Sequence, residues 1–447
     1  MKRLQAGALA AVLALPAALV PAAAHASADP AHYTGTLPDG ATWIADVPAR
    51  WNGTLILFSH GFGSLAPANR PSEAAGQALL DRGYALAGSS YDPDGSLWAL
   101  GSAVRDQIAT GAAVSKIIGR PRTTLALGQS MGGLVSAELA ETRAVDGVLT
   151  TCGIVGGGVD LNNYQLNAGH AIATLLAPSQ DIRLTGYTSA LDGIVAGAQL
   201  AQAVNDAQAT PAGRARIALA SAFLNQSSWF SGDAPPPRRD AAAQEVQQYQ
   251  WLTSGVLGFI FSGRYSIEQA AGGDSAWNKG LDYARLLRRS ANLRQVKTLY
   301  RQAGLNLKAD LAELTATADK RVEPGPLAWM TRTSEPTGRL AVPTLTIHTI
   351  SDQLVPVEHE NEYAAAVRAA RRAPLLRQAY VHRIGHCNFT ASEYVASLQA
   401  LEKRVKTRHW PGTTAESLNK AAASLSLDSS AFVRYRPAPL VVQPSHP

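Results

Sequence analysis

The segment TTLALGQSMGG, residues 123–133, constrains the fold of this chain more than any other stretch. It opens with a short apolar run typical of a strand, passes through a Gly-x-Ser-x-Gly pattern centred on Ser130, and continues into a helix-compatible segment. A serine on such a sharp turn has a strained backbone and an exposed hydroxyl. Strand and helix nearly touch there, so the residues two before and two after must be small, as Gly128 and Gly132 are. The stretch predicts a strand, a nucleophile elbow and a helix.

Strand-type and helix-type segments alternate around this stretch. Residues 33–47 hold two extended runs on either side of Pro-Asp-Gly, which is a hairpin signal. Further strand-type runs occupy residues 54–59, 84–88 and 147–152, and helical segments lie between them. Continuous apolar runs of this length are typical of strands buried on both faces of a parallel sheet. The alternation therefore predicts an α/β fold with a mainly parallel sheet.

A long helical block interrupts the alternation. From residue 160 to 338 the chain reads as helix after helix with no convincing strand, and strand character returns at residues 342–350 and 379–382. The block is best explained as a cap inserted between two strands of one sheet. We therefore expect the following segments: a signal peptide (1–28), a first core part (29–159), the helical cap (160–338), a second core part (339–408) and a C-terminal tail (409–447).

The amino-terminal residues predict export. Met1-Lys2-Arg3 precedes an apolar run, and Ala24-His25-Ala26-Ser27-Ala28 offers small residues for cleavage. The apolar run is short for a membrane span, so we expect a secreted protein, extracellular or periplasmic, with no membrane partner after cleavage. The formal charge of +6 would fall to +4 with loss of the two basic residues. No basic run with interleaved aromatic residues indicates a nucleic-acid partner.

Serine alone is a poor nucleophile, and the sequence offers it a base and an orienting carboxylate. Asp352 follows the returning strand in Ser-Asp-Gln-Leu-Val-Pro, and His386 lies in Ile-Gly-His-Cys-Asn-Phe after the last strand. Both residues are expected at the carboxyl edge of the sheet, where ligands bind in open α/β folds. The chain order Ser, Asp, His is the one expected of this fold.

At these motifs, together with His-Gly-Phe-Gly at residues 60–63, the chain resembles the α/β-hydrolase superfamily. The resemblance covers about residues 54–152 and 342–406. It implies Ser130 as nucleophile, His386 as general base and acid, and Asp352 as the orienting acid. It also implies an oxyanion hole formed by the backbone N–H groups of Phe62 and Met131. The helical block resembles the cap that many members carry over the active site, and neither cofactor nor metal is implied.

Several candidate residues have alternatives. Asp160, after the preceding strand, is the reserve for the acid role of Asp352. His60 is expected to shape the oxyanion turn, and His348 to be a hydrogen-bonded core residue. His382 and His386 lie on a strand and a loop, without the helical His-Glu-x-x-His pattern, so no metal site is expected. The glycine run at residues 156–158 lacks a dinucleotide fingerprint and is expected to be a flexible hinge into the cap.

The chain has only two cysteines, Cys152 and Cys387. One ends the strand next to the elbow strand, and the other directly follows His386. Disulfides persist in exported proteins, so a bridge that ties down the histidine loop is expected. Two free buried thiols are the alternative.

Three functions remain open. The first is a secreted serine hydrolase that cleaves a carboxylic ester of a small or oligomeric substrate through an acyl-enzyme. The second is a secreted peptidase that recognises an amino terminus, which would need cap carboxylates near Ser130; the candidates are Glu245, Glu268, Glu313 and Glu323. The third is a non-catalytic binding protein on a hydrolase scaffold, which would normally lack part of the triad. The acyl and alcohol groups and the oligomeric state do not follow from the sequence.

Overall fold

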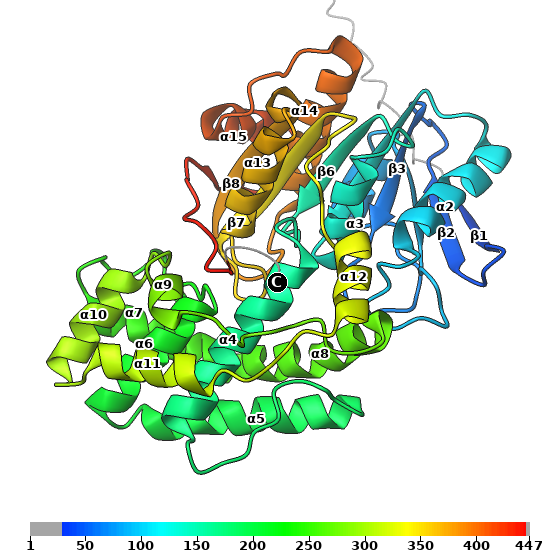
Figure 1. Cartoon of the computed structure of the whole chain (residues 1–447). Helices are drawn as coiled ribbons and strands as arrows, with labels where there is room; N and C mark the ends of the chain where they lie inside the picture. The colour runs from blue at the N-terminus through cyan, green and yellow to red at the C-terminus, as the bar shows by residue number, and fades with distance from the viewer. Residues whose placement is uncertain (1–28, 444–447) are drawn as a thin grey trace, which may run out of the picture.

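The computed structural model describes residues 29–443, so the predicted signal peptide lies outside the described residues. A nine-stranded sheet forms the centre of the molecule (Figure 1). Its strands are, in spatial order, β1 (Ala31–Thr36), β2 (Thr42–Val47), β4 (Ala85–Ser89), β3 (Thr54–Ser59), β5 (Thr123–Gln129), β6 (Gly147–Thr151), β7 (Thr344–Ser351), β8 (Leu376–Ile384) and β9 (Phe432–Val433). The strands from β4 to β8 are parallel, whereas β1, β2 and β9 extend the sheet in antiparallel pairing.

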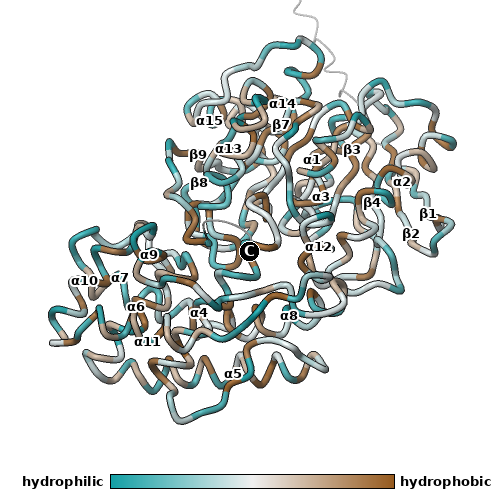
Figure 2. The backbone as a smooth tube through the Cα atoms, in the orientation of Figure 1, coloured by the Kyte–Doolittle hydropathy of each residue, from teal (hydrophilic) through white to brown (hydrophobic). Residues whose placement is uncertain are grey.

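The central strands are apolar because helices cover both faces of the sheet. All six residues of β3 are buried. Ile56 and Phe58 pack on one face with two helices, α1 (Glu73–Leu80) and α14 (Ala391–Thr407). Leu55 and Leu57 belong to the cluster on the other face. The helices of that face are α2 (Ala103–Ile118), α3 (Met131–Leu139) and α13 (His359–Ala369), the last followed by the 3₁₀ turn η2 (Ala373–Leu375). In Figure 2 the backbone along the central strands is coloured as hydrophobic.

The segment between β6 and β7 forms a helical cap at the carboxyl edge of the sheet (Figure 1). Its elements are α4 (Gly158–Leu176), α5 (Ala190–Ala207), α6 (Pro211–Phe223), α7 (Ala241–Trp251), η1 (Leu252–Val256), α8 (Leu257–Ala271), α9 (Tyr283–Leu287), α10 (Leu293–Gln302), α11 (Leu307–Thr317) and α12 (Pro324–Thr333). None of the helices within residues 29–443 is both long and apolar enough to cross a membrane.

The structure adds detail to the cap that the periodicity of the sequence did not reveal. Within the helical block expected over residues 160–338, the run from α7 to α8 is interrupted at η1, where Gly255 has a φ of 98°. Helix α4 has a weak apolar pattern, because its inner positions carry buried Asn162, Asn163 and Asn167.

The glycine run at residues 156–158 is a site of close packing, so the expected flexible hinge is wrong. A side chain at Gly157, where φ is 102°, would overlap the carboxylate of Glu335. One at Gly158 would press on Ser334, whose carbonyl accepts a hydrogen bond from the Gly158 amide at 2.7 Å. The run lets the chain pass between packed neighbours as it enters α4.

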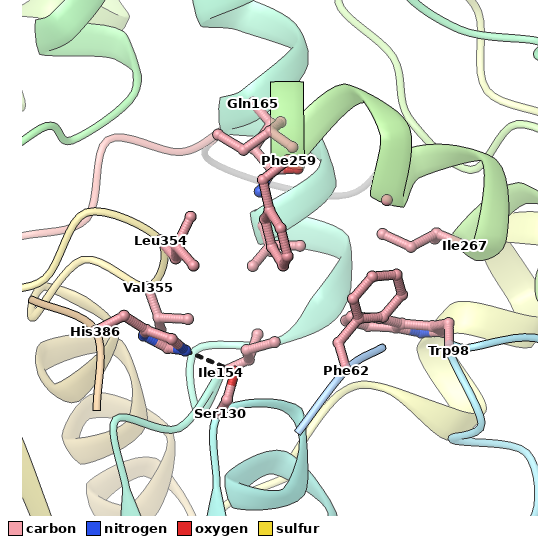
Figure 3. A pocket seen from close by; sticks show the side chains of 13 residues that line it. Phe62, Trp98, Ser130, Ile154, Gln165, Phe259, Ile267, Leu354, Val355 and His386 are labelled. Carbon is pink, nitrogen blue, oxygen red and sulfur yellow. Dashed lines mark hydrogen bonds between the residues drawn. The ribbon is translucent and has the colours of Figure 1, made fainter. Parts of the chain in front are cut away.

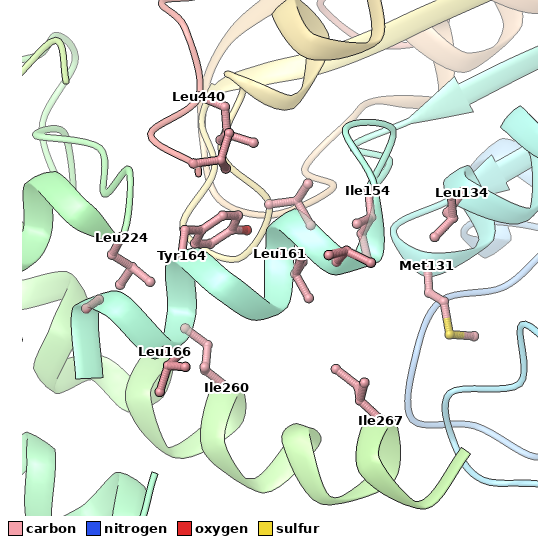
Figure 4. Packing of buried hydrophobic residues seen from close by; sticks show 14 of the residues in the cluster. Met131, Leu134, Ile154, Leu161, Tyr164, Leu166, Leu224, Ile260, Ile267 and Leu440 are labelled. Carbon is pink, nitrogen blue, oxygen red and sulfur yellow. The ribbon is translucent and has the colours of Figure 1, made fainter. Parts of the chain in front are cut away.

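The C-terminal tail fastens the cap to the core. After the short helix α15 (Ala415–Ala423) and strand β9, residues Leu440, Val441 and Val442 are buried. The amide of Val441 donates to the cap residue Asn225 at 2.7 Å, and that of Leu440 donates to Glu362 of the core helix α13 at 3.3 Å. Figure 4 shows Leu440 in the cluster that also holds residues of α4.

The tail supplies a stability prediction with a control in the same segment. Leu440→Ala should lower the free energy of unfolding by about 2–5 kcal/mol, because it leaves a cavity at a fully buried site. Leu427→Ala removes the same atoms from a side chain that is 42% exposed and should cost less than about 0.5 kcal/mol. Denaturant unfolding of both variants measures the difference. An equal decrease in the free energy of unfolding for both variants would show that packing of the tail between cap and core does not stabilise the protein.

Candidate active site

Ser130 occupies the turn between β5 and α3 that the sequence predicts. Its φ of 59° is unusual for a residue with a side chain. A methyl group at Gly128 would overlap the Gly132 carbonyl, and one at Gly132 would overlap the Ser59 carbonyl. The two glycines therefore allow the strand and the helix to approach closely, and this holds the Ser130 hydroxyl at the carboxyl edge of the sheet.

Two further loops at that edge bring Asp352 and His386 to Ser130. The His386 Nε2 lies 2.8 Å from the Ser130 Oγ, and its Nδ1 lies 2.7 Å from the Asp352 Oδ2 (Figure 3 shows the serine contact). The histidine loop begins at Gly385, whose φ is 104° and whose amide donates to the Ser351 carbonyl at 2.8 Å. This backbone bond joins the histidine loop to the acid loop and sets the distance between the two side chains.

Asp352 is buried and held in its ionised form. Its Oδ1 accepts hydrogen bonds from the amides of Leu354 and Val355, both at 2.9 Å. Burial by itself raises the pKa of a carboxyl group, but His386 and His348 hold the pKa of Asp352 well below its usual range. An ionised, fixed carboxylate can orient the imidazole and stabilise the imidazolium form.

His348 is a hydrogen-bonded core residue, as expected, but it also lies beside the acid. Its Nε2 is 2.9 Å from the Val355 carbonyl and 3.6 Å from the Asp352 Oδ2, while its Nδ1 is 3.3 Å from Glu360. Burial lowers the pKa of a histidine, but the two carboxylates outweigh it and raise the pKa of His348 to about 10. Both His348 and His386 therefore lie beside the Oδ2 atom of Asp352.

The expected oxyanion groups flank Ser130. The Gly61 backbone lies so close that an added Cβ would be 3.2 Å from the Ser130 Cβ, and Phe62 follows it. Within residues 29–443, neither the Phe62 nor the Met131 amide donates to another protein group. His60 shapes this turn: its Nδ1 is 2.8 Å from the Gly61 carbonyl and its ring stacks on Tyr91 at 4.2 Å.

The two cysteines form a disulfide beside the histidine. Cys152 ends the strand next to the elbow strand and Cys387 follows His386, and their Cα atoms lie 5.2 Å apart. Both residues have positive φ, 46° and 55°. Together with His386 they form the one Cys/His/Asp/Glu group in the described chain with metal-ligand spacing. A disulfide offers no thiolate for a metal, so this group instead anchors the histidine loop to the loop after β6.

The pocket over Ser130 is narrow and almost entirely apolar. Core residues Phe62 and Trp98 and the acid-loop residue Leu354 line it from below, and Figure 3 shows Phe259 and Gln165 of the cap above them. Its volume is about 50 Å³, whereas an engineered cavity that binds benzene measures about 150 Å³. A substrate with a ring can therefore enter only if lining groups move. Phe259 is 47% exposed and packs edge-on against Phe62 at 5.9 Å, so it is the side chain best placed to do so.

Other candidate residues lie away from this pocket. Asp160 is on the first turn of α4, makes no hydrogen bond to His386, and burial raises its pKa to about 7. Of the four cap carboxylates, Glu268 is occupied by the amides of Gly186 and Tyr187. No carboxylate lines the pocket in the described part of the chain. Three pocket residues were not predicted from the sequence: Trp98, Phe259 and Gln165. No local motif identifies a residue that reaches the pocket from a distant element.

Known proteins resemble the chain at two levels. No protein-family model matches it. Its fold is similar to that of feruloyl esterase B from Aspergillus oryzae, with 12% identity, a TM-score of 0.42, and coverage of 85% of this chain and 81% of that one. It is also similar to the acylaminoacyl peptidase of Pyrococcus horikoshii, with 11% identity, a TM-score of 0.40, and coverage of 87% and 44%. Similarity at this level says nothing about activity.

A much stronger similarity is to a curated protein. The chain is 30% identical over 431 residues to o-phthalyl amidase from Xanthobacter agilis. The match covers 89% of this chain and 92% of that protein, so it includes most of the core and of the cap. The sheet, the inserted cap and this full-length similarity agree: the chain is a hydrolase of the α/β-hydrolase superfamily and belongs to the same family as o-phthalyl amidase.

Proposed function

We propose that the protein is a secreted serine hydrolase that cleaves carboxylic acid derivatives through an acyl-enzyme on Ser130. The single observation that carries this proposal is the continuous hydrogen-bonded series from Ser130 through His386 to Asp352. Because His386 is bonded on both nitrogens, one of them can accept the serine proton while the other stays bound to the carboxylate. A binding protein on this scaffold would have no need of that arrangement.

The proposed reaction follows from the geometry. The Ser130 oxygen attacks the substrate carbonyl as its proton passes to His386 Nε2. The amides of Phe62 and Met131 stabilise the negative charge on the carbonyl oxygen, an effect worth about 2.7–4 kcal/mol per donor in other enzymes. His386 then gives its proton to the leaving group. Finally His386 takes a proton from water as the water attacks the acyl-enzyme, and it returns this proton to the Ser130 oxygen when the bond to the acyl group breaks and the free acid leaves.

The pocket favours an apolar or aromatic acyl group. Three aromatic rings, those of Phe62, Trp98 and Phe259, surround the space next to Ser130. The side chain of Gln165 is 6% exposed and has no hydrogen-bond partner within residues 29–443. We propose that its amide forms a hydrogen bond with a polar group on an otherwise flat, apolar acyl group of the substrate.

The ester bond is the first candidate for cleavage, and an amide bond is the second. The amide candidate is favoured by the relative, o-phthalyl amidase, which is 30% identical to this chain over 431 residues. Both bonds use the same acyl-enzyme, but an amide depends more on protonation of the leaving amine by His386. An aminopeptidase has less support, since within residues 29–443 no carboxylate lines the pocket to bind a free amino terminus.

Export belongs to the proposal as well. The Cys152–Cys387 disulfide is compatible with an oxidising compartment, where such bonds persist. Cleavage after Ala26 or Ala28 would release the mature chain.

Ser130→Ala tests the nucleophile. A fluorophosphonate probe should label the native protein and fail to label the variant. The kcat for hydrolysis should fall by on the order of 10⁶, as in serine hydrolases that lose their nucleophile. Circular dichroism provides the control for folding. Equal labelling of both proteins would place the nucleophile elsewhere.

Matched substrates test which bond is cleaved. The p-nitrophenyl ester and the p-nitroanilide of the same aromatic acid present one acyl group with two leaving groups. We expect turnover of the ester, and turnover of the anilide if the amidase function of the relative is shared. An aminoacyl p-nitroanilide tests the peptidase alternative. If it is hydrolysed with a higher kcat/KM than both aromatic substrates, the proposed acyl specificity is wrong.

A pair of Asp→Asn changes tests the acid. Asp352→Asn should lower kcat by about 10⁴, because an amide cannot hold His386 in the required tautomer or stabilise its charge. Asp160→Asn is the matched control and should leave kcat nearly unchanged, since Asp160 does not contact the imidazole. Steady-state kinetics on one ester decides between them. The reverse order of effects would identify Asp160 as the orienting acid.

A further inference from the structure

A second cavity lies on the far side of the acid loop from the catalytic pocket. The loop residues Leu354 and Val355 line the catalytic pocket. Their neighbours Ile350, Asp352 and Val357 line the second cavity, which measures about 560 Å³. Volumes of about 300–1,000 Å³ are typical of sites for small molecules. The cap and the C-terminal tail form the remaining walls. The tail has no role in the proposed reaction.

Three arginines surround this cavity, each from a different segment. Arg238 precedes α7, Arg294 is on α10, and Arg436 belongs to the tail. All three are exposed. In the described part of the chain, none of them has a hydrogen-bond or ion-pair partner. Guanidinium groups bind carboxylates in paired hydrogen bonds, so the cavity presents three uncommitted sites for such groups.

Buried amide groups form part of the inner wall. Gln226 is 2% exposed, and in the described part of the chain neither its Oε1 nor its Nε2 has a hydrogen-bond partner. Asn225 is held by the bond from Val441, yet its Nδ2 is also unpartnered. The Oε1 of Gln295 is unpartnered too, although its Nε2 donates to Gln248 at 2.8 Å. These atoms are sealed behind the cavity wall, so a ligand reaches them only if the side chains turn toward it, and the cost of leaving buried polar groups unpaired favours such a turn.

The acidic groups of the lining do little to offset the arginines. Asp352 is engaged by His386 and His348. Glu358 forms no salt bridge within residues 29–443, and burial raises its pKa to about 7. The rings of Trp229 and Tyr435 add apolar surface to the wall. The cavity therefore combines positive charge at the rim with amide and aromatic groups inside.

We propose that this cavity is a second binding site, separate from the catalytic pocket, for a small organic anion that carries more than one carboxylate. The arginines bind the carboxylates, and the amides of Asn225, Gln226 and Gln295 can bind further polar groups of the ligand once they turn toward the cavity. The cap, the tail and the acid loop meet here: the Ser227 Oγ is 2.8 Å from the Ser351 Oγ, next to Asp352. A bound anion would therefore bridge the cap and the loop that carries the orienting acid.

Calorimetric titration of the mature protein with citrate, at low salt, tests the proposal. Citrate should bind with a Kd below about 1 mM, and at least tenfold more tightly than inorganic phosphate. Arg294→Gln and Arg436→Gln should each weaken citrate binding about tenfold, by loss of a charge-assisted hydrogen bond. Both residues are exposed, so neither change threatens the fold.

Two controls fix the location of the site. Arg301→Gln removes an exposed arginine from the same helix, α10, outside the cavity, and should leave the Kd unchanged within about twofold. Gln165→Leu alters the catalytic pocket and should also leave it unchanged. The proposal is overturned if citrate does not bind, if phosphate binds as tightly, or if Arg301→Gln weakens binding as much as Arg294→Gln. It is likewise overturned if Gln165→Leu abolishes binding, which would place citrate in the catalytic pocket.

Discussion

The close approach of β5 and α3 at Ser130 is the constraint on which the site depends. A backbone with φ of 59° can turn from strand to helix in one residue, but only if no side chain stands between the two elements. Gly128 and Gly132 meet that condition. The turn leaves the Phe62 and Met131 amides beside the hydroxyl, without other protein partners in the described chain. The backbone conformation of the turn thus places the proposed nucleophile and its proposed oxyanion donors together.

The acid loop is the second organising element, because it separates two cavities of opposite character. On one side it faces an apolar pocket that contains Ser130 and His386. On the other it faces a polar cavity rimmed by arginines. The loop itself is stabilised by buried charge, with Asp352 between His386 and His348 and with Glu360 on the far side of His348. Such a network is rigid only while all its members are paired, so changes in either cavity can reach the acid.

The cap lies over the proposed nucleophile. Residues of α4 and α8 close the pocket, and the cluster that contains them continues through the cap to Leu440 of the tail (Figure 4). The interruption at Gly255 lies just before α8 and Phe259. This places a break in helical geometry next to the side chain that must move for a ring to enter. The tail, the cap and the core therefore form one packed unit around the pocket.

Local patterns in the sequence were enough to predict the α/β fold, the inserted cap and the order of the three candidate residues. Strand periodicity, the glycines around Ser130, and the positions of Asp352 and His386 directly after strands are all short-range signals. Topology then brings the ends of parallel strands to one edge, which is why distant loops could be expected to meet. The pairing of Cys152 with Cys387 followed from the same reasoning, although free thiols remained an alternative until the structure joined them.

Only the tertiary structure decided the rest. It placed Asp352, and not Asp160, against His386, because the bond from Gly385 to Ser351 sets the two loops side by side. It also placed Phe259 and Gln165 over the pocket, and the tail between cap and core. Such contacts join residues far apart in sequence, and each depends on how whole helices pack. No local sequence pattern predicts that packing. The turn at Ser130, in contrast, is predicted directly by the glycines that allow it.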